Sequence, residues 1–317
     1  MVETNVTSMS KLRLLSSNMP PVTGANLRPR LRMSRSLDDG AGPAYLKVLN
    51  TRPPKVVDMK LTQALILSLD TETTGPDPKH DKIVEIGGGY LQAGEQVGPM
   101  LRALVDPERY IPAGATQVHG IRNEDVENAP KWPEVAARLK THLDADPVLV
   151  GYNILGFDSP IINHENERNQ IDWRMPRSLD PFIWVMWYDR GAVVKKLGPT
   201  CERYGVSLPE DRAHTADADA FATGLLLMSM VIEGIIPDDV EWAFAEQAAL
   251  RQKLDEEYQE YGRAIFPDRE SGVYRLGMGK HCGTPIEEAD EGYLKWLAGR
   301  PDLTPTSRSI LKRALGE

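Results

Sequence analysis

Apolar and polar positions alternate along this chain in a way that predicts a layer of strands covered by helices. Residues 65–69 are uninterrupted apolar and small residues, which is typical of a strand buried on both faces. Residues 82–91 and 100–105 predict two more strands in a meander, and prolines end this part of the pattern. Residues 147–152 predict another strand, parallel to the first because a helix precedes it. We therefore expect an α/β fold.

The segments between and after these strands carry the spacing of helices. Apolar residues recur every three or four positions from Trp132 to Leu143, and Pro160 behind Asp158 and Ser159 marks the start of a further helix. A turn is expected at residues 116–121. Three more helices are expected, one carrying Leu197, Cys201 and Tyr204, an apolar one over about 215–232, and a charged one over 239–262.

The first strand ends in two carboxylates, three hydroxyls and a glycine, which is an unusual way for a buried strand to stop. Asp70 and Glu72 are two residues apart, so they project from the same face of the strand. Adjacent carboxylates repel each other unless a positive charge lies between them, and oxygen ligands suit a hard divalent metal. The alternative at this stage is a strand end with solvated acids.

Two later acidic sites stand in apolar or small-residue surroundings. Asp158 follows a predicted core strand and can either cap the next helix or serve a site. His214 and Asp219 are five residues apart, so they can converge only if His214 precedes the helix that carries Asp219. We interpret Asp217 as solvated, and Asp180 as structural.

Composition places limits on the function. The formal net charge is −9, but residues 1–60 contain ten Lys and Arg against four Asp and Glu, so the rest of the chain carries 27 against 42. A polyanionic substrate therefore needs bound metal ions or a local basic patch. The two cysteines show neither metal-ligand spacing nor a disulfide framework, and no apolar run is long enough to cross a bilayer. These features predict a cytoplasmic protein without a membrane partner.

Taken in order, these acidic sites form a recognisable pattern. The sequence Asp70-x-Glu72-Thr73-Thr74-Gly75, then Asn153 leading to Phe157-Asp158, then His214 with Asp219-Ala220, resembles the DEDDh 3′–5′ exonuclease superfamily, which includes proofreading exonucleases. The resemblance spans about residues 64–233. The sequence Val118-His119-Gly120-Ile121 also matches a family element that lines the nucleotide pocket.

The resemblance implies a fold and a set of roles. The fold is a ribonuclease H-like mixed sheet of five strands with helices on both faces. Two Mg²⁺ or Mn²⁺ ions about 4 Å apart assist phosphodiester hydrolysis, and nucleoside 5′-monophosphates leave from the 3′ end. The metal ligands are Asp70, Glu72, Asp158 and Asp219, the general base is His214, and the substrate-binding residues are Thr73, His119 and Asn153.

Four regions follow along the chain. They are a disordered basic arm (1–60), the exonuclease domain (61–236), a linker helix (237–272) and a small α+β module (273–317). The arm either contacts nucleic acid, directs transport as a transit peptide, or has no role. The module resembles the C-terminal module of exodeoxyribonuclease X. It is either a self-packed motif with Tyr293, Trp296 and Leu297 on one helix face, or a nucleic-acid contact through Lys280, His281, Lys295 and Arg300.

The expected partner is DNA, with a single-stranded 3′ end favoured, in replication or repair. Two alternatives stay open. One is an exoribonuclease of the same family that trims RNA, since nothing in the motifs separates deoxyribose from ribose. The other is a catalytically silent subunit that binds nucleic acid, which the presence of all five expected catalytic residues disfavours.

Overall fold

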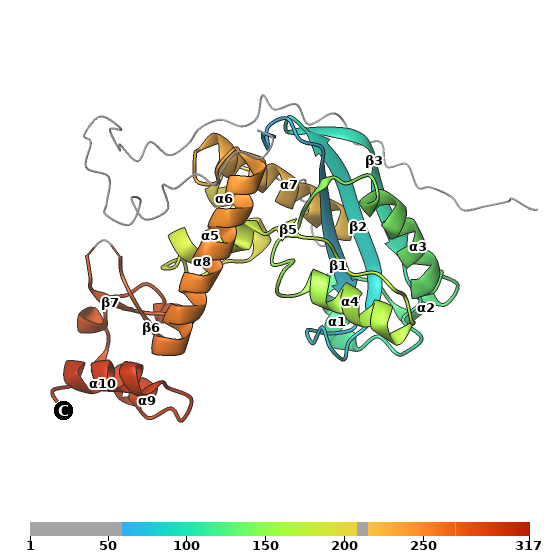
Figure 1. Ribbon diagram of the computed structural model, residues 1–317. Helices are drawn as coiled ribbons and strands as arrows, with labels where there is room; N and C mark the ends of the chain where they lie inside the picture. Colours follow the sequence, from blue (N-terminus) through green and yellow to red (C-terminus); the bar gives the residue numbers. More distant parts are fainter. Residues whose placement is uncertain (1–58, 208–214, 270) are drawn as a thin grey trace, which may run out of the picture.

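The computed structural model describes residues 59–207, 215–269 and 271–317. Its centre is a five-stranded sheet with strand order β3-β2-β1-β4-β5 (Figure 1). β1 pairs antiparallel with β2 and parallel with β4, so the sheet is mixed, as expected. The strands are β1 (Ile66–Thr73), β2 (Ile83–Gln92), β3 (Glu95–Leu104), β4 (Val148–Val150) and β5 (Ser178–Leu179).

Helices cover both faces of this sheet, which completes the predicted ribonuclease H-like architecture. Leu67 and Leu69 of β1 pack against α3 and α4, whereas Ile66 on the opposite face packs against α7 (Figure 1). This alternation follows from the two-residue period of a strand. In chain order, the helices before α8 are α1 (Ala113–His119), α2 (Asn123–Val126), α3 (Trp132–Leu143), α4 (Asp158–Arg168), α5 (Pro181–Tyr188), α6 (Leu197–Arg203) and α7 (Ala216–Ile232).

Two local expectations were wrong. Residues 116–121 were expected to be a turn, but most of them belong to α1, which ends at Gly120 with φ 76°. A helix of only seven residues gives too few apolar repeats to be read from spacing. The third strand begins at Glu95 rather than 100, because Ala93 and Gly94 form a tight turn with positive φ that closes the hairpin earlier.

A long helix and a small module follow. α8 (Val240–Tyr261) packs its first half into the main core through Val240, Ala243 and Leu250. The last residues form a core of their own that includes Leu276, Leu294, Leu297 and Leu311. Its elements are β6 (Ile265–Pro267), β7 (Tyr274–Leu276), η3 (Gly279–His281), η4 (Ile286–Glu288), α9 (Glu291–Ala298) and α10 (Pro305–Ala314).

Polar contacts join this module to the main domain. Glu257 of α8 pairs with both Arg190 and Arg269, and the Arg269 guanidinium lies 3.4 Å from the ring centre of Trp187. The Cys282 thiol approaches the backbone oxygen of Arg190 at 3.8 Å. The module is therefore anchored to the segment that follows α5.

Two further sequence expectations concern this part of the chain. Trp296 does not share a face with Leu297: its side chain is 55% exposed, whereas Leu297 is fully buried beside Leu294. Residues 1–58 of the predicted basic arm (1–60) lie outside the described residues. None of the helices in the described ranges is both long and apolar enough to span a bilayer.

Candidate active site

Three carboxylates from distant parts of the chain meet at the end of β1. Oxygen atoms of Asp70, Glu72 and Asp219 all lie within 4.8 Å of one another. Asp70 and Glu72 project from the face of β1 that α7 covers, and Asp219 comes from the first turn of α7. Both elements are firmly placed, since α7 lies across β1 and β2.

Asp158 lies beside this cluster at the first position of α4. Its buried carboxylate accepts a hydrogen bond of 2.7 Å from the hydroxyl of Thr71. Thr71 stands between Asp70 and Glu72 in the sequence and points to the opposite face of β1. The strand therefore supplies two acids of the cluster and also orients the fourth acid.

The electrostatics of the cluster favour binding of a positive charge. Burial, together with the charges of Asp158, Glu72 and Asp219, raises the pKa of Asp70 well above its ordinary value. Burial and the charges of Asp219, Glu85 and Asp158 raise the pKa of Glu72 to about 8. Burial raises the pKa of Asp158 to about 6, against the opposing effect of the Thr71 hydrogen bond. Repelling carboxylates that share a small space are stabilised by a hard divalent cation, so this donor set fits the expected metal.

His119 is buried next to the strand end. Its Nδ1 accepts a hydrogen bond of 3.0 Å from the backbone N–H of Ile121, so the neutral ring carries its proton on Nε2. Nε2 makes no hydrogen bond of good geometry among the described residues, and the nearby backbone of Thr73 opposes the fall in the His119 pKa. Burial lowers the pKa of His119, which favours the neutral ring. A buried N–H donor of this kind suits an incoming polar group.

The remaining predicted substrate residues differ in their setting. Asn153 is exposed and has φ 63°, and its backbone N–H donates to Asp180 at 2.7 Å. Asp180 also accepts from the N–H groups of Leu155 and Phe182, which agrees with a structural role. The hydroxyl of Thr73 donates to the backbone oxygen of Gly75 at 2.7 Å, within the loop that leaves β1.

Comparison with known proteins decides the family. The sequence profile of the family described as Exonuclease (RNase_T) matches residues 67–227, about half of the chain. The chain belongs to this exonuclease family. Its acidic residues, in their order, make it a member of the DEDDh exonuclease superfamily. The matched range contains the three clustered carboxylates and Asp158.

Several relatives are larger proteins, and only a part of each matches the exonuclease domain. The chain is 32% identical over 176 residues to the PolC-type DNA polymerase III of Ureaplasma parvum, a match that covers 55% of this chain and 12% of the polymerase. It is 32% identical over 170 residues to a DNA polymerase III subunit epsilon-like protein of Rhodobacter capsulatus, covering 53% of this chain and 24% of that protein. The chain thus matches only a small part of these relatives' length.

Solved structures of exonucleases resemble the chain at lower identity. Exonuclease X in complex with 5′-overhanging duplex DNA is 21% identical, with a TM-score of 0.43, and the match covers 56% of this chain and 99% of that one. E. coli exonuclease I in complex with a dA16 oligonucleotide is 17% identical, with a TM-score of 0.48, and the match covers 77% of this chain and 60% of that one.

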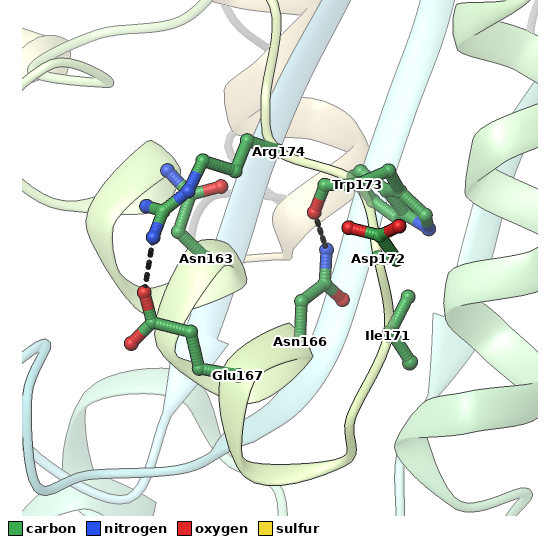
Figure 2. A pocket seen from close by; sticks show the side chains of 7 residues that line it. All are labelled: Asn163, Asn166, Glu167, Ile171, Asp172, Trp173 and Arg174. Atoms are coloured by element: carbon green, nitrogen blue, oxygen red, sulfur yellow. Dashed lines mark hydrogen bonds and ion pairs between the residues drawn. The ribbon is translucent and has the colours of Figure 1, made fainter.

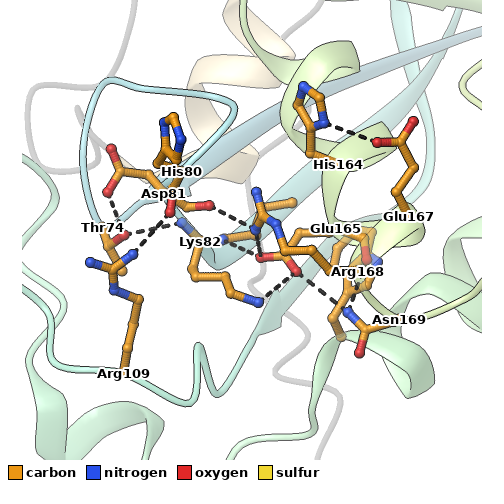
Figure 3. A network of polar contacts seen from close by, with 12 residues as sticks. Thr74, His80, Asp81, Lys82, Arg109, His164, Glu165, Glu167, Arg168 and Asn169 are labelled. Carbon is orange, nitrogen blue, oxygen red and sulfur yellow. Dashed lines mark hydrogen bonds and ion pairs between the residues drawn. The ribbon is translucent and has the colours of Figure 1, made fainter.

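The loop that follows Glu72 in this exonuclease is fixed by a polar network (Figure 3). The buried carboxylate of Glu165 in α4 accepts from the Lys82 ammonium at 3.1 Å and from the backbone N–H of Ile83 at 3.3 Å. Arg168 donates to the backbone oxygen atoms of Asp81 and Lys79. Nothing in the sequence singles out Glu165, because its partners Lys82 and Ile83 are 83 and 82 residues away.

Other expectations about the site have mixed outcomes. His214 lies outside the described residues, which resume at Thr215 immediately before α7. Asp217 was expected to be solvated, but it is buried. The start of α7 lies directly on β2, where a Cβ atom at Gly87 would come within 2.1 Å of the Asp217 nitrogen. This close approach removes Asp217 from water.

A surface hollow of about 310 Å³ lies apart from the carboxylates, along the outer side of α4 (Figure 2). Arg174 pairs with Glu167 across it, and the Asn166 amide donates to the backbone oxygen of Trp173. None of the predicted site residues lines this hollow. Its polar groups hold the segment after α4 in place.

The predicted cations of the C-terminal module are only partly available. Lys295 pairs with Glu291, and Arg300 pairs with Asp302. His281 lies against Tyr293, with ring centres 4.4 Å apart, and Tyr293 lies 5.4 Å from Trp296. A nucleic-acid contact at Lys280 therefore stays a prediction.

Proposed function

We propose that this protein is a metal-dependent 3′–5′ exonuclease that hydrolyses DNA and releases nucleoside 5′-monophosphates. The observation that supports this proposal best is the meeting of Asp70, Glu72 and Asp219 within 4.8 Å, with Asp158 beside them. The family shows that the chain is an exonuclease, whereas the polarity, the sugar and the number of metal ions belong to the proposal.

The four acids would hold the divalent ions, which supply positive charge at the phosphate and make bound water more acidic. Thr71 keeps the carboxylate of Asp158 in one orientation through its hydrogen bond. Asp70 and Glu72 are held in position by pairing of β1 with β2, and β4 pairs with the preceding part of β1 up to Ser68. A rigid arrangement of this kind reduces the reorganisation needed during reaction.

We assign the general base to His214, two residues before α7. A histidine near its ordinary pKa can take a proton from water at neutral pH. Asp219 lies in the first turn of α7, so a base just before this helix would reach the same end of the site. We assign substrate contacts to the Nε2–H group of His119, to Thr73 and to Asn153.

We propose DNA rather than RNA as the substrate because the relatives at 32% identity are DNA polymerase III proteins. The matched share of those proteins is small, so a polymerase partner for this chain is also part of the proposal. Acidic composition is compatible with a DNA substrate when the metal ions supply the local positive charge.

The test uses the full chain with Mn²⁺ and three oligonucleotides labelled at the 5′ end: single-stranded DNA, duplex DNA and RNA. The wild-type protein should shorten DNA stepwise from the 3′ end, and Asp70→Asn, which keeps the side-chain shape, should do so at least about 10³-fold more slowly. Faster shortening of RNA would favour the ribonuclease alternative. Binding of DNA with no shortening by the wild type would favour a silent subunit.

A further inference from the structure

We propose that Glu85 is a positioning residue of this active site, which holds the start of α7 so that Asp219 stays against Asp70 and Glu72. This inference rests on the proposed function, because it assumes that Asp219 binds metal. Glu85 lies in β2, directly opposite Glu72 of β1 in the strand register. It is fully buried, which is costly for a carboxylate without partners.

Both oxygen atoms of Glu85 have defined partners. Oε1 accepts from Nε of Arg102 at 2.7 Å, and Oε2 accepts from the backbone N–H of Ala216 at 3.2 Å. Arg102 belongs to β3 and Ala216 is the first residue of α7. A single carboxylate therefore joins an edge strand to the helix that carries Asp219.

The start of α7 depends on an acceptor from outside the helix. The first N–H groups of a helix lack partners within it, and the N–H of Ala216 is the first of these groups in α7. Glu85 supplies an acceptor for one of these groups, and its negative charge suits the positive end of the helix dipole. It acts as a cap that comes from another element.

Gly87 provides the space that this contact needs. Glu85 and Gly87 lie on the same face of β2, two residues apart. A Cβ atom at position 87 would lie 2.2 Å from the backbone carbon of Ala216, so only glycine allows the helix to come this close. Asp219 in turn donates its backbone N–H to the oxygen atom of Thr215 at 3.0 Å, so the first turn transmits the placement to Asp219.

Glu85 differs from the four acids in its connections. It is not one of the three carboxylates that come within 4.8 Å of one another, and each of its oxygen atoms already accepts a hydrogen bond. Besides its charge, which acts on Asp70 and Glu72, Glu85 can therefore affect metal binding through the position of α7. Residues that orient ligands in this way commonly change metal affinity by about 10- to 100-fold when they are replaced.

The experiment measures Mn²⁺ binding to the full-length protein by calorimetric titration in the absence of DNA. Glu85→Gln should weaken Mn²⁺ binding by about 10-fold.

Removing a negative charge also weakens binding of a cation, so a second variant separates the effect of charge from the effect of helix position. Arg102→Gln removes a positive charge near the cluster, and charge alone would strengthen Mn²⁺ binding. If Arg102 and Glu85 together position α7, Arg102→Gln should instead weaken binding by about threefold or more.

Glu257→Gln is the matched control, because it removes a carboxylate with two arginine partners far along the chain at the module junction. Its affinity for Mn²⁺ should stay within about twofold of the wild type. Thermal unfolding without metal checks that each variant is folded, and the partly exposed Arg102 offers the milder change. At saturating Mn²⁺, Glu85→Gln should lower kcat for DNA hydrolysis and leave KM unchanged.

Two results would overturn the inference: Mn²⁺ affinity within twofold of the wild type for Glu85→Gln, or tighter binding by Arg102→Gln. Failure of the proposed function gives a different result from these two. In that case the wild-type protein itself binds no Mn²⁺ and shortens no DNA, and the inference falls with it.

Discussion

The charge repulsion in the carboxylate cluster predicts that Glu72→Gln stabilises the metal-free protein at alkaline pH. In the folded protein the pKa of Glu72 is raised from 4.5 to about 8. The folded state therefore binds this proton more tightly than the unfolded state. The resulting stabilisation is complete below pH 4.5 and is lost as the pH rises through about 8. Glutamine has no proton to lose, so the variant lacks this pH dependence.

The size of the effect follows from the shift. One pKa unit corresponds to about 1.4 kcal/mol, so a shift from 4.5 to about 8 sets an upper limit of about 5 kcal/mol. Glu72 is partly exposed, and water screens part of the repulsion. We therefore expect the wild type to lose about 2 kcal/mol of unfolding free energy relative to Glu72→Gln between pH 5 and pH 8. For a protein of this size that is a difference of about 3 °C in melting temperature.

The assay is thermal unfolding in EDTA at several pH values between 5 and 8, for the wild type, Glu72→Gln and the control Glu124→Gln. Glu124 is exposed, so its replacement removes the same charge without relieving burial. The control should follow the wild-type pH dependence. With saturating Mn²⁺ the order should reverse, since ligand binding stabilises the wild type more. Parallel curves for the wild type and Glu72→Gln in EDTA would refute the reasoning.

Three further predictions follow from single contacts. Gly87→Ala should lower both the melting temperature and Mn²⁺ affinity, because the new Cβ collides with the Asp217 nitrogen at the start of α7. Unchanged values in both measurements would contradict this packing. Thr71→Val removes the hydrogen bond that lowers the pKa of Asp158, so the acidic limb of the pH–rate profile should move to higher pH while the protein stays folded. An unmoved limb would show that Thr71 does not orient Asp158. Lys280→Ala should reduce the slope of log Kd against log salt for DNA by about 1 if the C-terminal module contacts phosphate, and an unchanged slope would remove the module from the interface.

The parts that could be predicted from the sequence are those set by neighbouring residues. An apolar run that ends in Asp70 and Glu72 defines both a strand and the face on which the acids lie, and β1 confirms it. The apolar spacing of 215–232 likewise predicts α7 to within one residue. These features depend on local periodicity, which the sequence records directly.

The parts that could not be predicted depend on contacts between distant segments. The sequence around Asp217 predicts a surface acid, but packing of α7 on β2 buries it. The glycine that allows this packing, Gly87, is 130 residues earlier in the chain. Glu85 has a readable signal, since it is a charged residue inside an apolar strand, but its partner at Ala216 becomes visible only in the fold. Trp296 is exposed because Leu294 and Leu297 already fill the module's core.

The central claim is that acids from distant segments form one metal-binding pocket, and diffraction from crystals soaked in Mn²⁺ tests it most directly. The account predicts an anomalous peak within about 2.5 Å of carboxylate oxygen atoms of Asp70, Glu72 and Asp219, and no such peak in Asp70→Asn crystals. A strong peak elsewhere with none at the cluster, or a cluster peak that survives Asp70→Asn, would contradict it.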